Sequence, residues 1–208
     1  KIFTPSKQLL KLPTAALADA VAEEWSRQER DIQASKMPLT QLANTAIDHT
    51  HLNRSQVIED VTAYGQTDLL CYRVHSPSDL AEIQFRNWQP LLDWAELEYG
   101  AKLKTTTNLT PIKQSKAPLR ALHKAVASVD DFTLTGINVA TIATGSLVLA
   151  LALLSGYIDA ERAYTLAQLD EQFQIERWGE DPEAAIVGQK LKESITLATS
   201  FMILLNAP

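Results

Sequence analysis

The side chains in this sequence that could bind a metal ion or act as a thiol nucleophile are few. His49 and His51 are two residues apart in a polar stretch, and neither has a cysteine or a carboxylate at metal-ligand spacing. Cys71 lies between apolar neighbours with no activating base nearby, which favours a buried, inert thiol. As the single cysteine, it also excludes an internal disulfide and fits a reducing compartment. We therefore expect no metal site and no cofactor.

Carboxylates and hydroxyls do not form a recognisable catalytic arrangement either. Acidic residues occur in the adjacent pairs Glu23/Glu24, Asp130/Asp131 and Asp170/Glu171. Adjacent residues on a helix point about 100° apart, so such pairs do not share a proton as catalytic dyads do. Ser146 lies within a helical run rather than in a strand–turn–helix context, and no phosphate-binding glycine loop is present. We expect no catalytic residues and no enzyme activity.

The most informative stretch is residues 159–183, which we predict to begin with one continuous helix. Asp159 is placed to cap its start, and Gly179 is placed to end it in a left-handed conformation. Leu166, Leu169 and Phe173 recur at three- and four-residue spacing, so they share one apolar face. This face is expected to pack into the core.

A line of polar residues runs beside that apolar face. Asp170, Gln174 and Arg177 fall on one stripe at helical spacing, and Trp178 follows at the end of the helix. One interpretation is a set of ordinary surface pairs, each worth a few tenths of a kcal/mol. The other is a recognition edge, where charged groups beside an apolar surface orient a partner. Both remain open from the residues alone.

The elements that would position these residues are mostly helical. Hydrophobic spacing, caps and prolines predict helices over about 14–28, 38–48, 54–65, 131–154, 159–179 and 182–205, and a further helix that opens at Pro118. A long helical pattern starts at Ser76 or Ser78 and runs to about Tyr99, with a kink or a junction of two helices at Pro90. Residues 1–13 read as two short strands around a turn, 102–107 as a half-exposed strand, and 68–73 as a strand or an extended link. We therefore predict a mostly helical α+β fold. Residues 1–70 would form a small N-terminal region with short β-strands, and residues 71–208 a larger all-helical domain.

The apolar run 137–154 is long enough to be weighed as a membrane span. Polar residues dilute its first half and no basic residues flank it, so a central buried helix is favoured. The net charge of −6 argues against a nucleic-acid binder, which needs a clustered basic surface. We expect a soluble monomer with no membrane insertion and no nucleic-acid partner.

Several separated segments resemble one protein family in order and spacing. They are MPLTQLANTAID (37–48), DLLCYR (68–73), WQPLLDW (88–94), TGSLVLALAL (144–153) and LAQLDEQFQIERWGED (166–181). The family they resemble is that of the assembly chaperones of the soluble catalytic head of ATP synthase, the ATP synthase assembly factor 2 family, found in mitochondria and related bacteria. The resemblance implies a protein that binds the free α subunit and prevents its aggregation until it pairs with β.

The resemblance also implies a small N-terminal region that contains β structure. This chain is expected to begin partway through that region. The resemblance further implies that the segment around Asp170, Gln174 and Arg177 matters for handling the client. Its candidate partner-binding residues are Asp170, Glu171, Gln174, Glu176, Arg177 and Trp178. We expect Asp170→Lys to weaken binding of the α subunit without unfolding the protein, and Trp178 to be partly buried.

Two other classes stay open at this point. One is a small helical hydrolase or transferase, and the other is a scaffolding protein with a different client. No signal peptide is visible. Together with the resemblance, this leads us to expect a soluble protein of a bacterial cytoplasm or a mitochondrial matrix.

Overall fold

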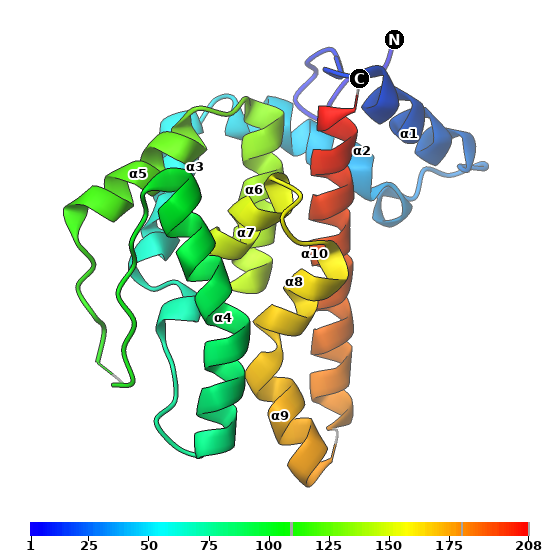
Figure 1. The fold of residues 1–208 in the computed structure, drawn as a ribbon. Coiled ribbons are helices and arrows are strands. Elements are labelled where there is room, and N and C mark those ends of the chain that lie inside the picture. Colours follow the sequence, from blue (N-terminus) through cyan, green and yellow to red (C-terminus); the bar gives the residue numbers. More distant parts are fainter. Residues whose placement is uncertain (109, 180, 208) are drawn as a thin grey trace.

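A computed structural model describes residues 1–108, 110–179 and 181–207, and these residues are largely helical (Figure 1). The α-helices are α1 (Ala15–Ser26), α2 (Pro38–Thr45), α3 (Arg54–Ala63), α4 (Ser78–Tyr99), α5 (Lys116–Ala127), α6 (Asp131–Thr144), α7 (Leu147–Leu154), α8 (Ala160–Ala167), α9 (Leu169–Trp178) and α10 (Pro182–Asn206). A π-helical turn, Ala46–Thr50, continues α2, and 3-10 turns cover Ala34–Lys36, Tyr64–Gln66 and Leu69–Cys71.

The predicted α+β fold with short N-terminal β-strands is wrong, because the residues that the structure describes contain no strand. The N-terminal turn forms a single antiparallel bridge, Phe3 to Leu9. Lys7 takes a left-handed conformation at φ 63°, and Asp48 accepts bonds from Thr4 Oγ1 at 2.6 Å and from the Ser6 N–H at 3.0 Å. The polar groups of this turn therefore form hydrogen bonds with Asp48 in the π-helical turn that continues α2, and they do not extend the Phe3–Leu9 bridge into a β-ladder.

Residues 102–107 are extended but do not form the predicted strand. They make one parallel bridge, between Tyr72 and Thr106. Beside it, the Gln114 side chain accepts from the Lys104 N–H at 2.9 Å and donates to the Lys104 carbonyl at 2.8 Å. A single side-chain amide therefore satisfies the backbone groups that a neighbouring strand would have paired.

The core is built around α7, which is buried along its length. Leu147 to Leu153 are each at most 4% exposed, and α4, α6 and α8 pack around them. Gly145 ends α6 at φ 67°, and the Ser146 hydroxyl caps α7 by accepting from the Leu149 N–H at 3.1 Å. The predicted helix over 131–154 is therefore two helices. Among the described residues no helix combines the length and the apolar character needed to cross a membrane.

A buried carboxylate joins the 3-10 turn at residue 69 to the start of α7. Asp68 is 0% exposed and accepts from Ser146 Oγ at 2.7 Å, from the Val148 N–H at 3.1 Å and from the Leu70 N–H at 3.2 Å. Burial nevertheless raises the pKa of Asp68 to about 6, because the charged form is disfavoured away from water even where hydrogen bonds favour it.

Helices α6 and α10 pack tightly at Gly136, where the absence of a side chain makes the approach possible. A Cβ placed on Gly136 would lie 2.6 Å from Met202 Cγ and 3.3 Å from Met202 Sδ. The C-terminal half of α10 is buried through Ile195, Phe201 and Met202. Figure 1 shows this half of α10 beside α6, while the N-terminal half continues below the core.

A smaller hydrophobic cluster joins the N-terminal helices to the end of α10. It consists of Leu17, Val21, Leu42, Ala43 and Phe201. The larger cluster includes Val57 and Val61 of α3 together with residues of the C-terminal helices. The division into units at residue 70 remains a prediction.

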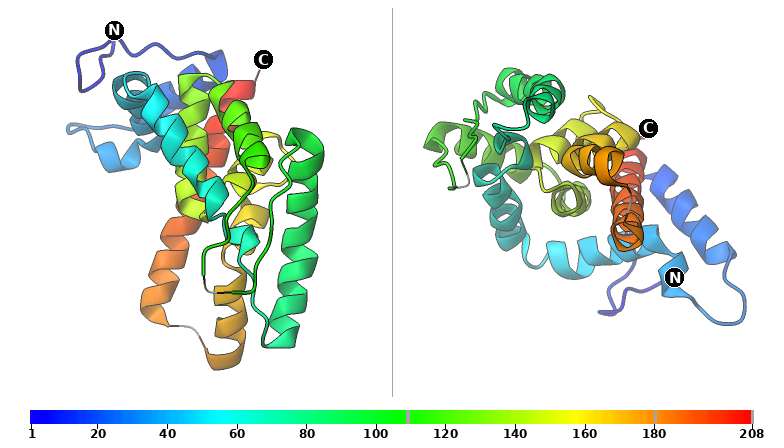
Figure 2. Two further views of the ribbon diagram at one scale, coloured as in Figure 1. Left: turned by 90° about the vertical axis from the view of Figure 1, so that its left-hand side faces the viewer. Right: turned by 90° about the horizontal axis from the view of Figure 1, so that it is seen from below.

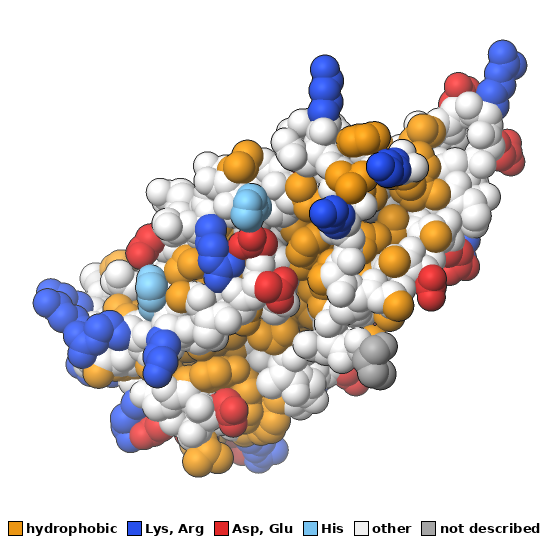
Figure 3. All heavy atoms as spheres, turned by 90° about the horizontal axis from the view of Figure 1, so that it is seen from above, with side chains coloured by type: hydrophobic (Ala, Val, Ile, Leu, Met, Phe, Trp, Pro, Cys, Tyr) orange, Lys and Arg blue, Asp and Glu red, His pale blue; other side chains and the backbone are white. Residues whose placement is uncertain are grey.

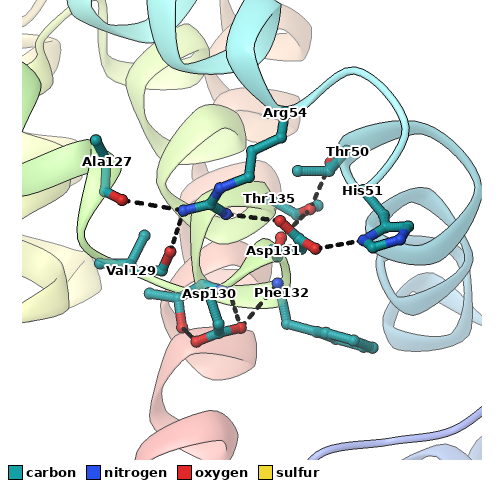
Figure 4. Close-up of polar contacts among 10 residues, drawn as sticks. Thr50, His51, Arg54, Ala127, Val129, Asp130, Asp131, Phe132 and Thr135 are labelled. Atoms are coloured by element: carbon teal, nitrogen blue, oxygen red, sulfur yellow. Dashed lines mark hydrogen bonds and ion pairs between the residues drawn. The ribbon is translucent and has the colours of Figure 1, made fainter.

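A polar junction holds α3, α5 and α6 together (Figure 4). Arg54 at the start of α3 donates to Asp131 Oδ1 at 2.6 Å and to the Ala127 carbonyl at 3.1 Å. His51 Nδ1 lies 2.8 Å from Asp131 Oδ2. The hydrogen bonds from His51 and Arg54 lower the pKa of Asp131 despite its partial burial. One carboxylate thus fixes the angle at which α3 and α6 meet.

Replacing Gly136 by alanine tests the α6–α10 contact, because helix propensity would raise the free energy of unfolding whereas a steric clash would lower it. Alanine stabilises an exposed helix position relative to glycine by about 0.5–1 kcal/mol. We expect Gly136→Ala instead to lower the free energy of unfolding by about 1–3 kcal/mol, because its Cβ has no room beside Met202. Urea denaturation measures this. In the double variant with Met202→Ala the two costs should be less than additive; a stabilised Gly136→Ala protein would contradict the tight contact.

Asp68 makes stability depend on pH. Its folded pKa lies above the unfolded value of 3.8, so its contribution is complete below pH 3.8 and is lost as pH rises through about 6. Relative to Asp68→Asn, the free energy of unfolding of the wild type should fall by about 2–3 kcal/mol across that window. Denaturation series at matched pH values measure the difference. Parallel pH curves for the two proteins would show that Asp68 titrates normally.

Candidate partner-binding surface

The predicted helix over 159–179 is two helices with a break at Gln168. Asp159 caps α8 as predicted, with Oδ1 accepting from the Arg162 N–H at 2.7 Å. The break occurs where Trp88 of α4 donates its indole N–H to the Leu166 carbonyl at 3.0 Å. In a continuous helix that carbonyl would pair with the N–H of Asp170. A buried side chain from another helix therefore helps to end α8, and α9 starts in a new direction.

The apolar face of α8 and α9 lies where the spacing predicts. Leu166, Leu169 and Phe173 are 1%, 7% and 8% exposed, respectively. Gly179 ends α9 at φ 88°, and its N–H donates to the Ile175 carbonyl at 2.9 Å. Its ψ of 165° is extended, so the predicted left-handed cap is replaced by a sharper change of direction into α10.

Asp170 binds an interior side chain of α4. Gln84 is 0% exposed, and its amide donates from Nε2 to Asp170 Oδ1 at 2.7 Å while its Oε1 accepts from the Val74 N–H at 2.8 Å. Both ends of this buried amide are thereby satisfied. Asp170 is half-buried, and it holds α9 against α4 and the segment before α4.

Arg177 makes a second connection between the same helices, in the last turn of α9. Its guanidinium donates to Asp79 at the start of α4 and lies 4.3 Å above the centre of the Phe173 ring. Gln174, between the two ends of the polar line, is exposed. The two ends of the polar line therefore contact α4, Asp170 at a half-buried position and Arg177 at the surface.

The other predicted site residues face α10. Glu171 and Glu176 line a groove of about 390 Å³ between α8–α9 and the first half of α10, together with Tyr164, Gln168 and Gln189. At the floor of the groove, α8 and α10 approach closely at Tyr164 and Gly188. A Cβ placed on Gly188 would lie 3.2 Å from Tyr164 Oη. Glu171 and Glu176 are thus separated from the Asp170 side of the helix.

Trp178 is far more exposed than predicted. It is 74% exposed at the tip of the hairpin that α9 and α10 form. Two aliphatic side chains of α10, Ile186 and Val187, are 59% and 67% exposed on the same hairpin. Both views of Figure 2 show the hairpin with the first half of α4, and the left view shows that they extend below the rest of the molecule. We call these three residues the tip patch.

The tip patch lies in an acidic part of the chain. Residues 170–183 contain six acidic side chains and one basic one. Asp170 and Arg177 are held by Gln84 and Asp79, whereas Glu171 and Glu176 face the groove. The surface is therefore apolar at its tip and negatively charged along one side.

A second apolar surface occupies the opposite end of the molecule. Viewed from above in Figure 3, hydrophobic side chains gather over the end with the N-terminal turn and α1. Phe3 is 58% exposed there, and a groove of about 310 Å³ is lined by Ile2, Leu12 and Trp25 among others. Trp25 is half-buried.

The residues first considered for chemistry are placed as structural groups. Burial raises the pKa of the Cys71 thiol to about 12, so the thiolate is disfavoured. Ser146 caps α7 and binds Asp68. No cluster of three or more potential metal-binding side chains occurs among the described residues. Sequence reasoning missed Gln84, Trp88 and Asp79, because their role depends on contacts between distant segments.

Comparisons with known proteins agree with this architecture. The sequence profile described as ATP12 chaperone protein matches residues 1–96. The crystal structure of Atp12 from Paracoccus denitrificans is 41% identical, with a TM-score of 0.95 over 98% of this chain and 88% of that one. A crystal structure from Agrobacterium tumefaciens is 33% identical, with a TM-score of 0.91 over 98% of this chain and 76% of that one.

A mitochondrial relative is more distant. The protein named atp12 of Schizosaccharomyces pombe is 25% identical over 190 residues, which cover 85% of this chain. The chain spans 65% of the length of that curated relative.

The matching family model describes a class of chaperones. The chain belongs to the ATP12 chaperone family, which confirms the resemblance found in its motifs.

The hydrogen bond that Asp170 accepts from Gln84 can be separated from the charge of Asp170. Asp170→Asn keeps an oxygen for the Gln84 amide and removes the charge, whereas Asp170→Ala leaves the buried amide without an acceptor. We expect Asp170→Ala to lose about 1–3 kcal/mol of unfolding free energy, and Asp170→Asn less than half of that loss. Chemical denaturation measures both. Equal losses would show that the charge, and not the hydrogen bond, holds α9. The same contact leads us to expect that Asp170→Lys, proposed above as a binding variant, also destabilises the fold.

Proposed function

We propose that this protein is an assembly chaperone of ATP synthase that binds the free α subunit of the soluble catalytic head. It would prevent aggregation of that subunit until it pairs with β. Membership of the ATP12 chaperone family and the motif resemblance support the class of client. The observation that carries the proposal is the tip patch, which exposes three large apolar side chains on a well-anchored hairpin.

The tip patch has the properties of a protein-binding surface. Large apolar side chains such as Trp178 contribute most to binding when a partner removes them from water. Glu171 and Glu176 beside the patch would favour a client surface with basic or polar donors and disfavour acidic ones. The α4–α9 contacts of Asp170 and Arg177 keep the hairpin in place, which reduces the ordering cost of binding.

Asp170 therefore acts on the client through the position of α9, and Trp178, Ile186 and Val187 make the contact. This assignment changes the expected roles within the predicted set of six residues. Asp170 and Arg177 are positioning residues, Trp178 is a contact residue, Glu171 and Glu176 set the charge around it, and Gln174 is an exposed polar neighbour.

Binding would be reversible and driven by burial of apolar surface. Release would follow when the β subunit competes for the same surface of α, because a more extensive α–β interface outweighs that with the chaperone. The mitochondrial and bacterial relatives support a location in a mitochondrial matrix or a bacterial cytoplasm.

Co-expression with the cognate α subunit tests the proposed client. With β absent, we expect the α subunit to remain soluble and to co-purify with this protein, and to aggregate when expressed alone. Added β should displace the chaperone. An α subunit that stays insoluble and uncaptured would exclude the proposed client and favour a scaffolding protein with a different partner.

Matched variants locate the contact. Val187→Lys places a charge in the tip patch, and Leu97→Lys makes the same kind of change at an 87% exposed site at the far end of α4. Both positions are exposed, so both variants should keep wild-type melting temperatures. We expect Val187→Lys to weaken α-subunit binding at least tenfold in a titration and Leu97→Lys less than twofold. Loss of binding in Phe3→Lys with normal binding in Val187→Lys would move the contact to the N-terminal end.

A further inference from the structure

A second hollow, away from the tip patch, lies between the segment before α4, one face of α4 and the extended arm that follows residue 104. Its volume is about 610 Å³. Arg73 and Val74 form one side, Phe85 and Gln89 of α4 another, and Thr105 to Asn108 the third. None of these residues belongs to the surface described above.

Arg73 in this hollow has an incompletely satisfied guanidinium. Its Nε donates to the Leu70 carbonyl at 3.1 Å, but a terminal nitrogen, Nη2, is buried without a hydrogen-bond partner among the described residues. Its guanidinium carbon lies 6.0 Å from the centre of the Phe85 ring. Burial lowers the pKa of Arg73, since the cation is partly removed from water. A buried cation without a counter-charge is costly, and buried charges in proteins are normally paired.

No acidic side chain among the described residues forms an ion pair with Arg73. Asp93 acts on Arg73 only at a distance, since no ion pair joins them within the described residues, and it accepts instead from Gln89 Nε2 at 2.8 Å. The stretch 100–129, which contains the extended arm, holds six lysines and arginines and no acidic residue. The local field around the hollow therefore favours an anion.

The other walls of the hollow fit an anionic side chain of a protein. Thr105 and Thr107 carry hydroxyls that make no hydrogen bond to other described residues, so they are available as donors. Phe85 is 59% exposed and offers an apolar wall for the methylene groups of an acidic residue. A single planar guanidinium matches a carboxylate in charge and geometry, whereas a doubly charged phosphate is usually held by several cations or a backbone cradle.

We propose that the hollow around Arg73 binds a carboxylate side chain of a partner protein, with Arg73 as its counter-charge and the Thr105–Thr107 hydroxyls as additional donors. The site does not depend on the identity of the client, because it is defined by the unpaired guanidinium and its surroundings.

Thermal melting with defined probes tests the site. A short blocked peptide containing glutamates, at about ten times its dissociation constant, should raise the melting temperature of the wild type by about 3–5 °C. The same peptide with glutamines should have no effect. Arg73→Met should abolish the response, while Arg120→Met, the same change at an exposed arginine of α5, should retain it. Without peptide, Arg73→Met should melt no lower than the wild type, because an unpaired buried charge is removed.

Inorganic phosphate at matched ionic strength separates the two sources of an anion. A response to phosphate that requires Arg73, with no response to the glutamate peptide, would overturn the assignment to a protein carboxylate. An equal peptide response in Arg73→Met would overturn the role of Arg73. The NMR signal of the Arg73 Nε–H in the wild type provides a measurement that needs no variant. It should shift with the glutamate peptide and not with the glutamine peptide, and an unchanged signal would exclude the site.

Discussion

The packing of α6 against α10 at Gly136 is the contact on which the surface of this protein depends. Because glycine adds no side chain there, α10 approaches α6 closely enough for Met202 and Phe201 to fill the space between the two main hydrophobic clusters. The C-terminal half of α10 is thereby fixed in the core. Its N-terminal half is the continuation of a rigid helix, so it extends beyond the core without needing a core of its own.

Polar contacts from α4 then set the position of α9 beside that extension. Trp88 helps to end α8 by binding the Leu166 carbonyl, and Gln84 holds the start of α9 through Asp170. Arg177 connects the end of α9 to Asp79 at the start of α4. The buried Trp88 and Gln84 groups specify geometry more than they add stability, since each must find its partner. The hairpin can thus expose Trp178 while its base stays ordered.

The sequence allowed good prediction wherever the controlling contact is local. Asp159 and Thr14 cap α8 and α1 as their positions indicate, and the inward faces of the helices follow from their spacing. The predicted strands and continuous helices failed where a distant group intervened. Gln114 replaces a strand partner for Lys104, Asp48 takes the polar groups of the N-terminal turn, and Trp88 interrupts the helix at Leu166.

The candidate site shows the same limit. Spacing correctly grouped Asp170, Gln174 and Arg177 on one stripe, but it cannot show that the stripe faces α4 instead of solvent. Trp178 was expected to be half-buried because tryptophan usually is, and its position after the last core contact of α9 leaves it exposed. The unpaired nitrogen of Arg73 has no sequence signal, because it depends on which of the described residues lie around it in space.

The molecule is therefore expected to divide into an anchored base and a client-binding tip. Amide hydrogen exchange of the protein, alone and in complex with the α subunit, measures this division directly. If the tip patch binds the α subunit, new protection is expected in α9 and in the first half of α10. The second half of α10 should change little, because the core already protects it. Protection confined to the N-terminal turn and α1, with none in the α9–α10 hairpin, would contradict this expectation.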